Sequence, residues 1–166
     1  MNKDKEINSD LPYRLGVGAL ILNANDDVFV AKRIDTPGPA WQMPQGGIDD
    51  GEDPAVAIFR EVEEEIGTSK CKIIAQSNGW LTYDIPEDLR EKLWGGKYRG
   101  QKQKWYAMRF LGDDSDIVLD AHHKPEFSEW RWVEMKQVPN LIVPFKRELY
   151  NKIVDEFSNI VSKDNS

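Results

Sequence analysis

The sequence contains one cysteine, Cys71, in 166 residues. Because a disulfide needs two thiols, the chain cannot form an internal disulfide, and a metal site built from several cysteines is excluded as well. Disulfides are rare in the reducing cytosol and common in exported proteins. The shortage of cysteine therefore predicts a protein of the cytoplasm.

Long apolar runs and excess positive charge are also missing. No segment approaches the roughly 18 to 20 apolar residues of a membrane span, and the first ten residues, MNKDKEINSD, lack the apolar stretch of a signal peptide. The formal net charge of -7 argues against a protein that coats nucleic acid through its overall field. No membrane partner is expected. A phosphate-bearing substrate stays compatible with this charge if cations cluster locally or metal ions screen the carboxylates.

The composition that remains is that of a folded domain. Hydrophobic residues make up 40% of the chain, and six tryptophans and six phenylalanines supply bulk for a core. A chain of this length suits one domain that needs neither disulfides nor an obligate protein partner to bury its core. We expect a polar tail over residues 1–10, a single domain over 11–161 and a second tail over 162–166.

Alternating apolar residues predict several strands. Residues 15–21 and 28–32 flank a polar turn at 23–27, a pattern typical of a hairpin. Further strands are predicted at 73–75, 105–111 and 129–133. Residues 84–100 carry Pro, Gly-Gly and many charges and predict a long loop, whereas apolar residues after Pro144 recur at helical spacing. Strands mixed with two helices indicate an α/β layered fold.

The segment 46–68, GGIDDGEDPAVAIFREVEEEIGT, is the most informative part of the sequence. An ordered loop rich in Gly, Pro and Asp, residues 41–51, leads to Asp53 and Pro54, the usual pairing of an N-cap with proline at the first helical position. Gly67 supplies the end of the predicted helix. The residues at helical spacing that would face the core are Ala55, Ile58, Val62 and Ile66.

This helix carries glutamate at positions 61, 63, 64 and 65. At 100° per residue, Glu64 and Glu65 flank Glu61 at about -60° and +40°, so three carboxylates share a face from which Glu63 points away. Like charges at this spacing repel, a penalty that bound cations would offset. Oxygen ligands suit Mg²⁺, with Mn²⁺ or another divalent cation as a substitute. The alternative interpretation is a solvated acidic helix face, the usual meaning of a run such as EVEEE.

The whole segment resembles the Nudix box: glycine, five residues, glutamate, seven residues, then Arg-Glu-apolar-any-Glu-Glu-any-Gly-apolar. The matching residues are Gly46, Glu52, Arg60, Glu61, Val62, Glu64, Glu65 and Gly67. Thr68 departs from the final apolar position, where a change should affect packing rather than chemistry. The resemblance implies an α/β/α sandwich with a mixed β-sheet, and hydrolysis of a nucleoside diphosphate linked to another group.

The same resemblance implies roles for the box residues. The metal ligands that it implies are Glu61, Glu64, Glu65 and a backbone carbonyl near Gln45 and Gly46. Metal ions in this position would neutralise a polyphosphate and lower the pKa of a bound water. Arg60 would orient the carboxylates, and Glu52 would be structural, near the helix N-terminus where its charge is favourable.

Beyond the box, the stretches WQMPQGGI, GWLTYDIP, GQKQKWY, PEFSEWRWV and VPFKRELY look like the bacterial RNA pyrophosphohydrolases and the similar dinucleoside polyphosphate hydrolases. They imply an RNA 5′ end or a dinucleoside polyphosphate as substrate without separating the two. By position, Glu126 would be a further metal ligand or a catalytic base. Arg33 and Phe145 would sandwich a base, and Arg14 and Lys146 would contact phosphate or base. Core packing at the head of a helix is an equal alternative for Phe145.

Positive charge gathers at Lys97, Arg99, Lys102 and Lys104 in an otherwise acidic chain. This cluster could hold a polyphosphate or the first RNA phosphates, although a solvent-facing strand explains Lys102 and Lys104 equally well. Tyr83 could bring its ring to a nucleobase. The rival function is a catalytically silent Nudix-fold module that only binds nucleotides, for which three repelling glutamates on one face have no purpose.

Overall fold

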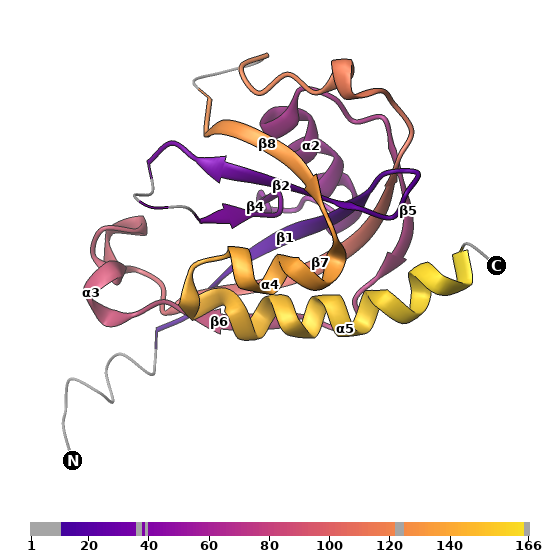
Figure 1. Ribbon diagram of the computed structural model, residues 1–166. Helices are drawn as coiled ribbons and strands as arrows, with labels where there is room; N and C mark the ends of the chain where they lie inside the picture. The colour runs from indigo at the N-terminus through magenta and orange to yellow at the C-terminus, as the bar shows by residue number, and fades with distance from the viewer. Residues whose placement is uncertain (1–10, 36–37, 39, 122–124, 165–166) are drawn as a thin grey trace.

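The computed structural model describes residues 11–35, 38, 40–121 and 125–164 (Figure 1). The tail predicted over residues 1–10 lies outside this part of the chain. None of the helices in the described ranges is long and apolar enough to cross a membrane. The strands are β1 Tyr13–Leu22, β2 Val28–Arg33, β3 Trp41–Gln42, β4 Gln45–Gly47, β5 Cys71–Gln76, β6 Leu81–Asp84, β7 Gly100–Phe110 and β8 Phe127–Val133.

All of these strands belong to one mixed sheet. Its main path is β3-β2-β1-β7-β5, with β4 paired to β1, β6 to β7 and β8 to β2. Strands β1 and β7 are parallel over ten residue pairs, whereas the other pairings are antiparallel. The predicted hairpin is confirmed: β1 pairs with β2 at Leu22 and Val28, and the Asn23 side chain closes the turn by accepting hydrogen bonds from the backbone N–H groups of Asn25 and Asp27.

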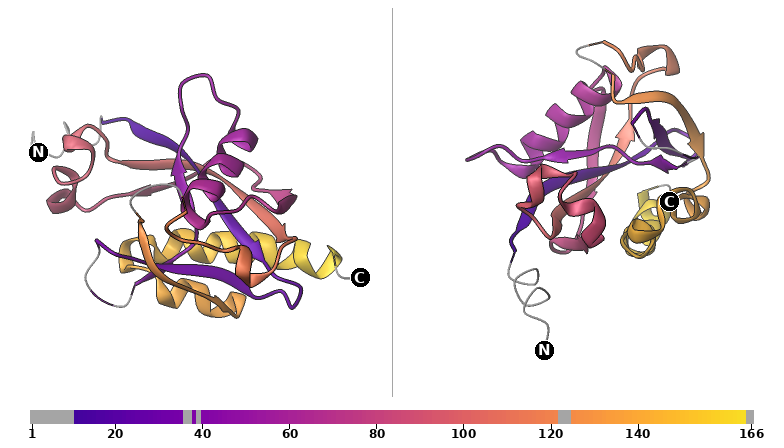
Figure 2. Two further views of the ribbon diagram at one scale, coloured as in Figure 1. Left: turned by 90° about the horizontal axis from the view of Figure 1, so that it is seen from above. Right: turned by 90° about the vertical axis from the view of Figure 1, so that its left-hand side faces the viewer.

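Helices cover both faces of the sheet, as Figure 2 shows from two sides. They are α2 Pro54–Ile66, α3 Glu87–Arg90, α4 Val138–Leu141 and α5 Arg147–Asp164. On one face, Ile58 of α2 packs with Phe29 and Phe127; on the other, Phe157 of α5 packs with Trp105, and all four aromatic rings are at most 2% exposed. The predicted α/β/α sandwich with a mixed sheet is confirmed.

Helix α2 begins and ends where its sequence predicts. The Asp53 side chain caps it by accepting a 2.8 Å hydrogen bond from the N–H of Ala55, and Pro54 is the first helical residue. Gly67 ends it with φ 83°, a left-handed conformation that favours glycine. A Cβ at Gly67 would also stand 2.4 Å from the carbonyl oxygen of Val118. These local signals set the start and the end of α2, and therefore the helical stretch that carries the glutamates.

Other boundaries differ from the sequence-based predictions. Residues 41–51 hold two short strands instead of a loop, because β3 pairs with β2 and β4 pairs with β1. Residues 84–100 hold the helix α3, and α4 and β6 had not been predicted. Strand β7 starts at Gly100, five residues before the predicted start, and α5 continues to Asp164, beyond the predicted boundary at 161. Short strands depend on pairing with neighbours, which local pattern does not reveal.

Candidate active site

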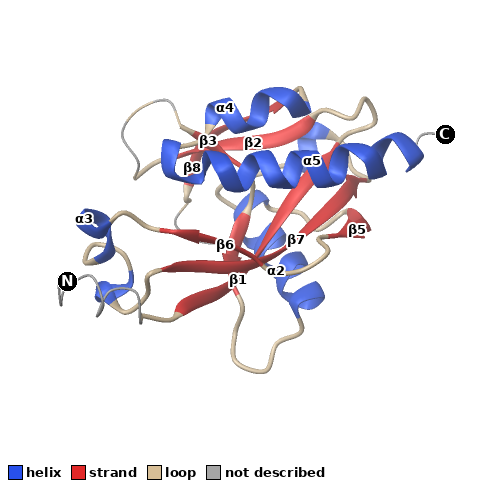
Figure 3. Cartoon of the chain, turned by 90° about the horizontal axis from the view of Figure 1, so that it is seen from below, coloured by secondary structure: helices blue, strands red, loops and turns tan. Residues whose placement is uncertain are grey.

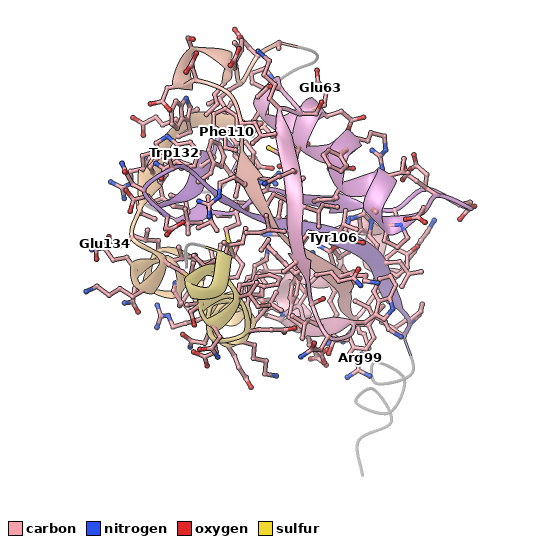
Figure 4. The ribbon with its side chains drawn as sticks, turned by 90° about the vertical axis from the view of Figure 1, so that its right-hand side faces the viewer. Glu63, Arg99, Tyr106, Phe110, Trp132 and Glu134 are labelled. Carbon is pink, nitrogen blue, oxygen red and sulfur yellow. The ribbon has the colours of Figure 1, made fainter. Side chains whose placement is uncertain are left out.

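Two glutamates of α2 are turned toward the sheet. The side chain of Glu61 is 13% exposed and Glu65 is only 6% exposed, whereas the side chain of Glu64 at the rim is 44% exposed. Glu63 extends outward from the helix (Figure 4). Burial raises the pKa of Glu65 well above its usual range, and the charges of Glu126 and Glu61 raise it further. The structure therefore places a costly buried carboxylate where the helix meets the sheet.

Glycine at position 46 makes room for the Glu61 carboxylate. A Cβ on Gly46 would lie 2.0 Å from the carboxyl carbon of Glu61, which leaves no space for any side chain there. Gly46 lies in β4, paired with Val17 of β1, so the sheet holds its backbone against the helix. Burial raises the pKa of Glu61 to about 7, while Arg60 opposes that rise.

Arg60 ties the carboxylates of this segment together. Its guanidinium donates hydrogen bonds of 2.8 Å to Glu52 and Glu61 and of 2.9 Å to the carbonyl oxygen of Gly47, and it reaches Glu64 at 3.4 Å. The same guanidinium lowers the pKa of Glu52 to about 2. Arg60 thus orients Glu61 from the side, and Glu52 holds Arg60 in place. Both arrangements agree with the structural roles expected for these two residues.

Glu126, in the segment just before β8, lies near the same carboxylates. Its carbonyl oxygen accepts a 2.9 Å hydrogen bond from the N–H of Ile34, and its carboxylate lies 4.0 Å from the guanidinium of Arg33. The charge of Glu126 raises the pKa of both Glu61 and Glu65, as expected when carboxylates share one site. Within the described ranges, no three acidic, histidine or cysteine side chains stand close enough to hold a metal ion as they are.

The donor set nevertheless fits a divalent cation. One carboxylate oxygen of Glu65, Oε2, is buried without a hydrogen-bond partner, an arrangement that a buried charge avoids unless something else compensates it. The backbone at Gly46 leaves space only for the Glu61 carboxylate. Carboxylate and carbonyl oxygens are the ligands preferred by hard divalent cations. Glu61, Glu64, Glu65 and Glu126 would supply them.

Replacing Gly46 with alanine is expected to lower turnover roughly 10- to 100-fold, the loss of activity that follows when a metal ligand is displaced. The reason is steric: the new methyl group takes the place of the Glu61 carboxylate. The fold should stay intact. The measurement is kcat/KM together with the melting temperature. Gly79→Ala is the matched control, since no atom lies within 4 Å of a Cβ there. Equal activity of the two variants would contradict the placement of Glu61.

A cationic and aromatic wall stands beside the carboxylates. The Lys146 Nζ lies 5.2 Å from the centroid of the Tyr83 ring, and the rings of Tyr83 and Phe145 are 6.2 Å apart. Burial lowers the pKa of Lys146 to about 8; the charge of Arg33 lowers it further, while Glu65 raises it. Arg33, Lys146 and Glu65 are therefore close enough to influence one another. Tyr83 is 7% exposed, so its ring forms part of a wall and is not a free platform.

Two buried glutamines of β7 belong to this wall, although the sequence had not singled them out. The side-chain N–H of Gln101 donates a 2.8 Å hydrogen bond to the Tyr83 hydroxyl, and that of Gln103 donates a 2.6 Å bond to the side-chain oxygen of Gln45. They alternate in GQKQKWY with Lys102 and Lys104. Successive side chains of a strand point to opposite faces, so a strand with Lys102 and Lys104 on its solvent face has Gln101 and Gln103 on its buried face. This alternation could have revealed the two glutamines from the sequence.

The remaining predicted residues divide between the two faces of the sheet. Arg14 faces the wall: its guanidinium lies 5.2 Å from the centroid of the Trp94 ring, and a Cβ on Gly47 would stand 2.3 Å from one of its nitrogens. Lys102 and Lys104 alternate with the buried Gln101 and Gln103 and project from the opposite face of β7. The two lysines therefore project to the side of the sheet on which α2 lies, away from the wall.

Comparisons with known sequences cover most of the chain. The NUDIX domain profile matches residues 12–153. An RNA pyrophosphohydrolase of Rhodospirillum rubrum is 56% identical over 148 residues, which cover 89% of this chain and 88% of that protein. An RNA pyrophosphohydrolase of Rickettsia conorii is 50% identical over 161 residues, covering 97% and 99% of the two chains.

Solved structures share the architecture at low sequence identity. The Escherichia coli dihydroneopterin triphosphate pyrophosphohydrolase superposes with a TM-score of 0.67 at 19% identity, over 86% of this chain and 97% of its own. An Ap4A hydrolase of Caenorhabditis elegans, in a binary complex, superposes with a TM-score of 0.65 at 20% identity, over 90% and 98% of the two chains. At these identities the likeness establishes the fold alone.

Proposed function

The chain belongs to the Nudix family and is a pyrophosphohydrolase, an enzyme that hydrolyses phosphoanhydride bonds. We propose that its substrate is the triphosphorylated 5′ end of RNA. The observation that carries this proposal is an identity of 50% to RNA pyrophosphohydrolase over 97% of the chain. That span includes the helix α2 with its carboxylates and the wall formed by Tyr83, Phe145 and Lys146. An intact set of four carboxylates favours an enzyme over a silent nucleotide-binding module.

The carboxylates would hold the divalent cation that this chemistry requires, and we propose Mg²⁺, with Mn²⁺ as a substitute. Its ligands would be Glu61, Glu64, Glu65, Glu126 and the carbonyl oxygen of Gly46. When bound, the cation supplies positive charge to the polyphosphate and lowers the pKa of water. Arg60 keeps Glu61 and Glu64 oriented, and the exposed carboxylate of Glu126 accepts the proton of the attacking water.

The wall beside the carboxylates would hold the substrate. Arg14 and Lys146 offer positive charge to phosphate oxygens. Arg33 and Phe145 offer two flat surfaces between which a base stacks, each such contact being worth about 1 to 3 kcal/mol. Tyr83 would support this surface, since its ring centroid lies 6.2 Å from that of Phe145 and 5.2 Å from the Lys146 Nζ. Lys102 and Lys104 are not part of this wall, because they project from the other face of β7.

The end products of the reaction test the proposal. We expect release of pyrophosphate, or of phosphate in two steps, from a 5′-triphosphorylated RNA, leaving a 5′-monophosphate that a monophosphate-dependent exonuclease degrades. Release of phosphate products from diadenosine tetraphosphate alone, with RNA left intact, would show that the dinucleoside polyphosphate is the substrate instead.

The single thiol, Cys71, is buried and suits a reducing compartment, so the cytoplasm is the proposed location.

Loss of the base-stacking pair is expected to weaken RNA turnover while the fold survives. For Arg33→Ala and Phe145→Ala we predict a decrease in kcat/KM of roughly 5- to 100-fold, equivalent to the stacking of one base. Arg33 pairs with the exposed Asp35, so its removal should cost little stability. The measurement is kcat/KM on triphosphorylated RNA with melting temperatures alongside. Unchanged turnover in both variants would remove the stacking role.

A further inference from the structure

Part of the sheet is left uncovered on the side of α2. Strands β1, β7 and β6 lie side by side near the start of the chain, with Leu15 opposite Lys102 and Lys102 opposite Thr82 (Figure 3). Residues paired across neighbouring strands project to the same face. Trp80 and Lys104 continue the pattern two residues away. These five residues, Leu15, Trp80, Thr82, Lys102 and Lys104, are called the open face below.

The open face is in contact with solvent. Leu15 is 48% exposed and Trp80 is 39% exposed, and Thr82 and Lys102 are exposed too. Farther along β1, the same face is covered by α2, where Val17 is fully buried. Leu15 and Trp80 give this exposed face an apolar component.

The charge of the open face is opposite to that of the whole chain. The net charge is -7, yet this surface presents two lysines, neither of which forms an ion pair with a residue in the described part of the chain. The Lys102 Nζ lies 5.9 Å from the centroid of the Trp80 ring. A cation next to an exposed ring is the combination that binds single-stranded RNA, because the cation attracts phosphate and the ring stacks a base.

We propose that the open face binds single-stranded RNA downstream of the 5′ end that the carboxylate site receives. This inference rests on RNA being the substrate. Arg14 and Tyr83 project to one face of the sheet, and their chain neighbours Leu15 and Thr82 project to the other, so a single sheet layer separates the two surfaces. Within the described residues β6 pairs only with β7, so the RNA can pass around its free edge. A dinucleotide is too short to reach both surfaces.

The test is direct binding of a labelled single-stranded RNA of about 12 nucleotides with a 5′-hydroxyl, measured by fluorescence anisotropy at several salt concentrations. This RNA carries no phosphoanhydride, so the result is independent of turnover. We expect Trp80→Ala and Lys102→Glu each to weaken binding about 5-fold or more. Lys136→Glu is the matched control: it makes the same charge change on a side chain that is 83% exposed, in the turn after β8, and should be close to wild type. Trp80→Ala should also lower the ratio of kcat/KM for a 12-nucleotide substrate to kcat/KM for a triphosphorylated dinucleotide.

The outcomes separate this inference from the proposed function. Weaker binding in both open-face variants, together with RNA hydrolysis by the wild type, supports the inference. Weaker binding with no hydrolysis of RNA would overturn the proposed substrate, and with it the downstream position of the bound RNA, although the surface would still bind RNA. Unchanged binding in both variants, with normal RNA hydrolysis, would overturn the inference and leave the substrate intact. Absence of RNA binding by the wild type, with binding of phosphatidylserine vesicles through the same residues, would overturn it in favour of a membrane surface.

Discussion

Replacing Glu61, Glu64 or Glu65 with glutamine is expected to lower kcat/KM at least about 10²-fold, whereas Glu63→Gln should stay near wild type. Each substitution removes one charge from the same helix, so Glu63→Gln is a matched control for net charge and helix propensity. The difference arises because Glu61 and Glu65 face the sheet and Glu63 extends outward (Figure 4). If Glu63→Gln were as damaging as Glu64→Gln, the assignment of the helix face would be wrong.

Stability measurements separate lost chemistry from lost structure in this series. Glu65 is 6% exposed and one of its oxygens has no partner, and a neutral amide costs less to bury than a carboxylate. Glu65→Gln should therefore melt at or above the wild-type temperature in the presence of a chelator, although its activity is lost. A large drop in melting temperature would instead attribute the lost activity to unfolding.

Glu126→Gln is expected to lower kcat at saturating Mg²⁺ by about 10²- to 10⁴-fold, the scale of a lost general base. Glu126 belongs to the segment before β8 and its side chain is 52% exposed, so it can follow the attacking water, whereas Glu64 is fixed on α2. A base must be deprotonated to act, so wild-type activity falls at low pH. That acidic limb should disappear in Glu126→Gln.

Glu64→Gln is the comparison for this prediction, because loss of a metal ligand should differ in kind from loss of a base. Its activity should recover in part at high Mg²⁺ or with Mn²⁺, and its pH profile should keep the acidic limb. The measurement is kcat across pH at saturating metal for both variants. Complete recovery of Glu126→Gln by metal, with an unchanged profile, would move the base to the helix.

Local signals were enough to predict where α2 begins and ends. Asp53 with Pro54 marks the start, Gly67 marks the end, and each of these is confirmed by an observed cap. Helical geometry then orders the glutamates without knowledge of the rest of the chain. The family resemblance rests on the same stretch, and the NUDIX domain match over residues 12–153 confirms it.

Contacts between residues far apart in the sequence could not be predicted from local signals. The pairing of β2 with β8 brings Glu126 beside Arg33, 93 positions away in sequence, and nothing in PEF itself reveals that contact. In β7 the lysines drew attention by their charge, whereas the buried Gln101 and Gln103 face the site. Which face of a strand is buried depends on what packs against it, and only the fold supplies that.

The most direct test of the central claim is a competition assay in one tube, with a 5′-triphosphorylated RNA and diadenosine tetraphosphate at equal concentrations, with and without Mg²⁺. Competing substrates are consumed in proportion to kcat/KM, so the ratio of products reports the preference of the enzyme without further assumptions. We predict that RNA is converted to its 5′-monophosphate first, and that a chelator stops both reactions. Conversion of RNA in the presence of the chelator, or exclusive cleavage of diadenosine tetraphosphate, would contradict the account.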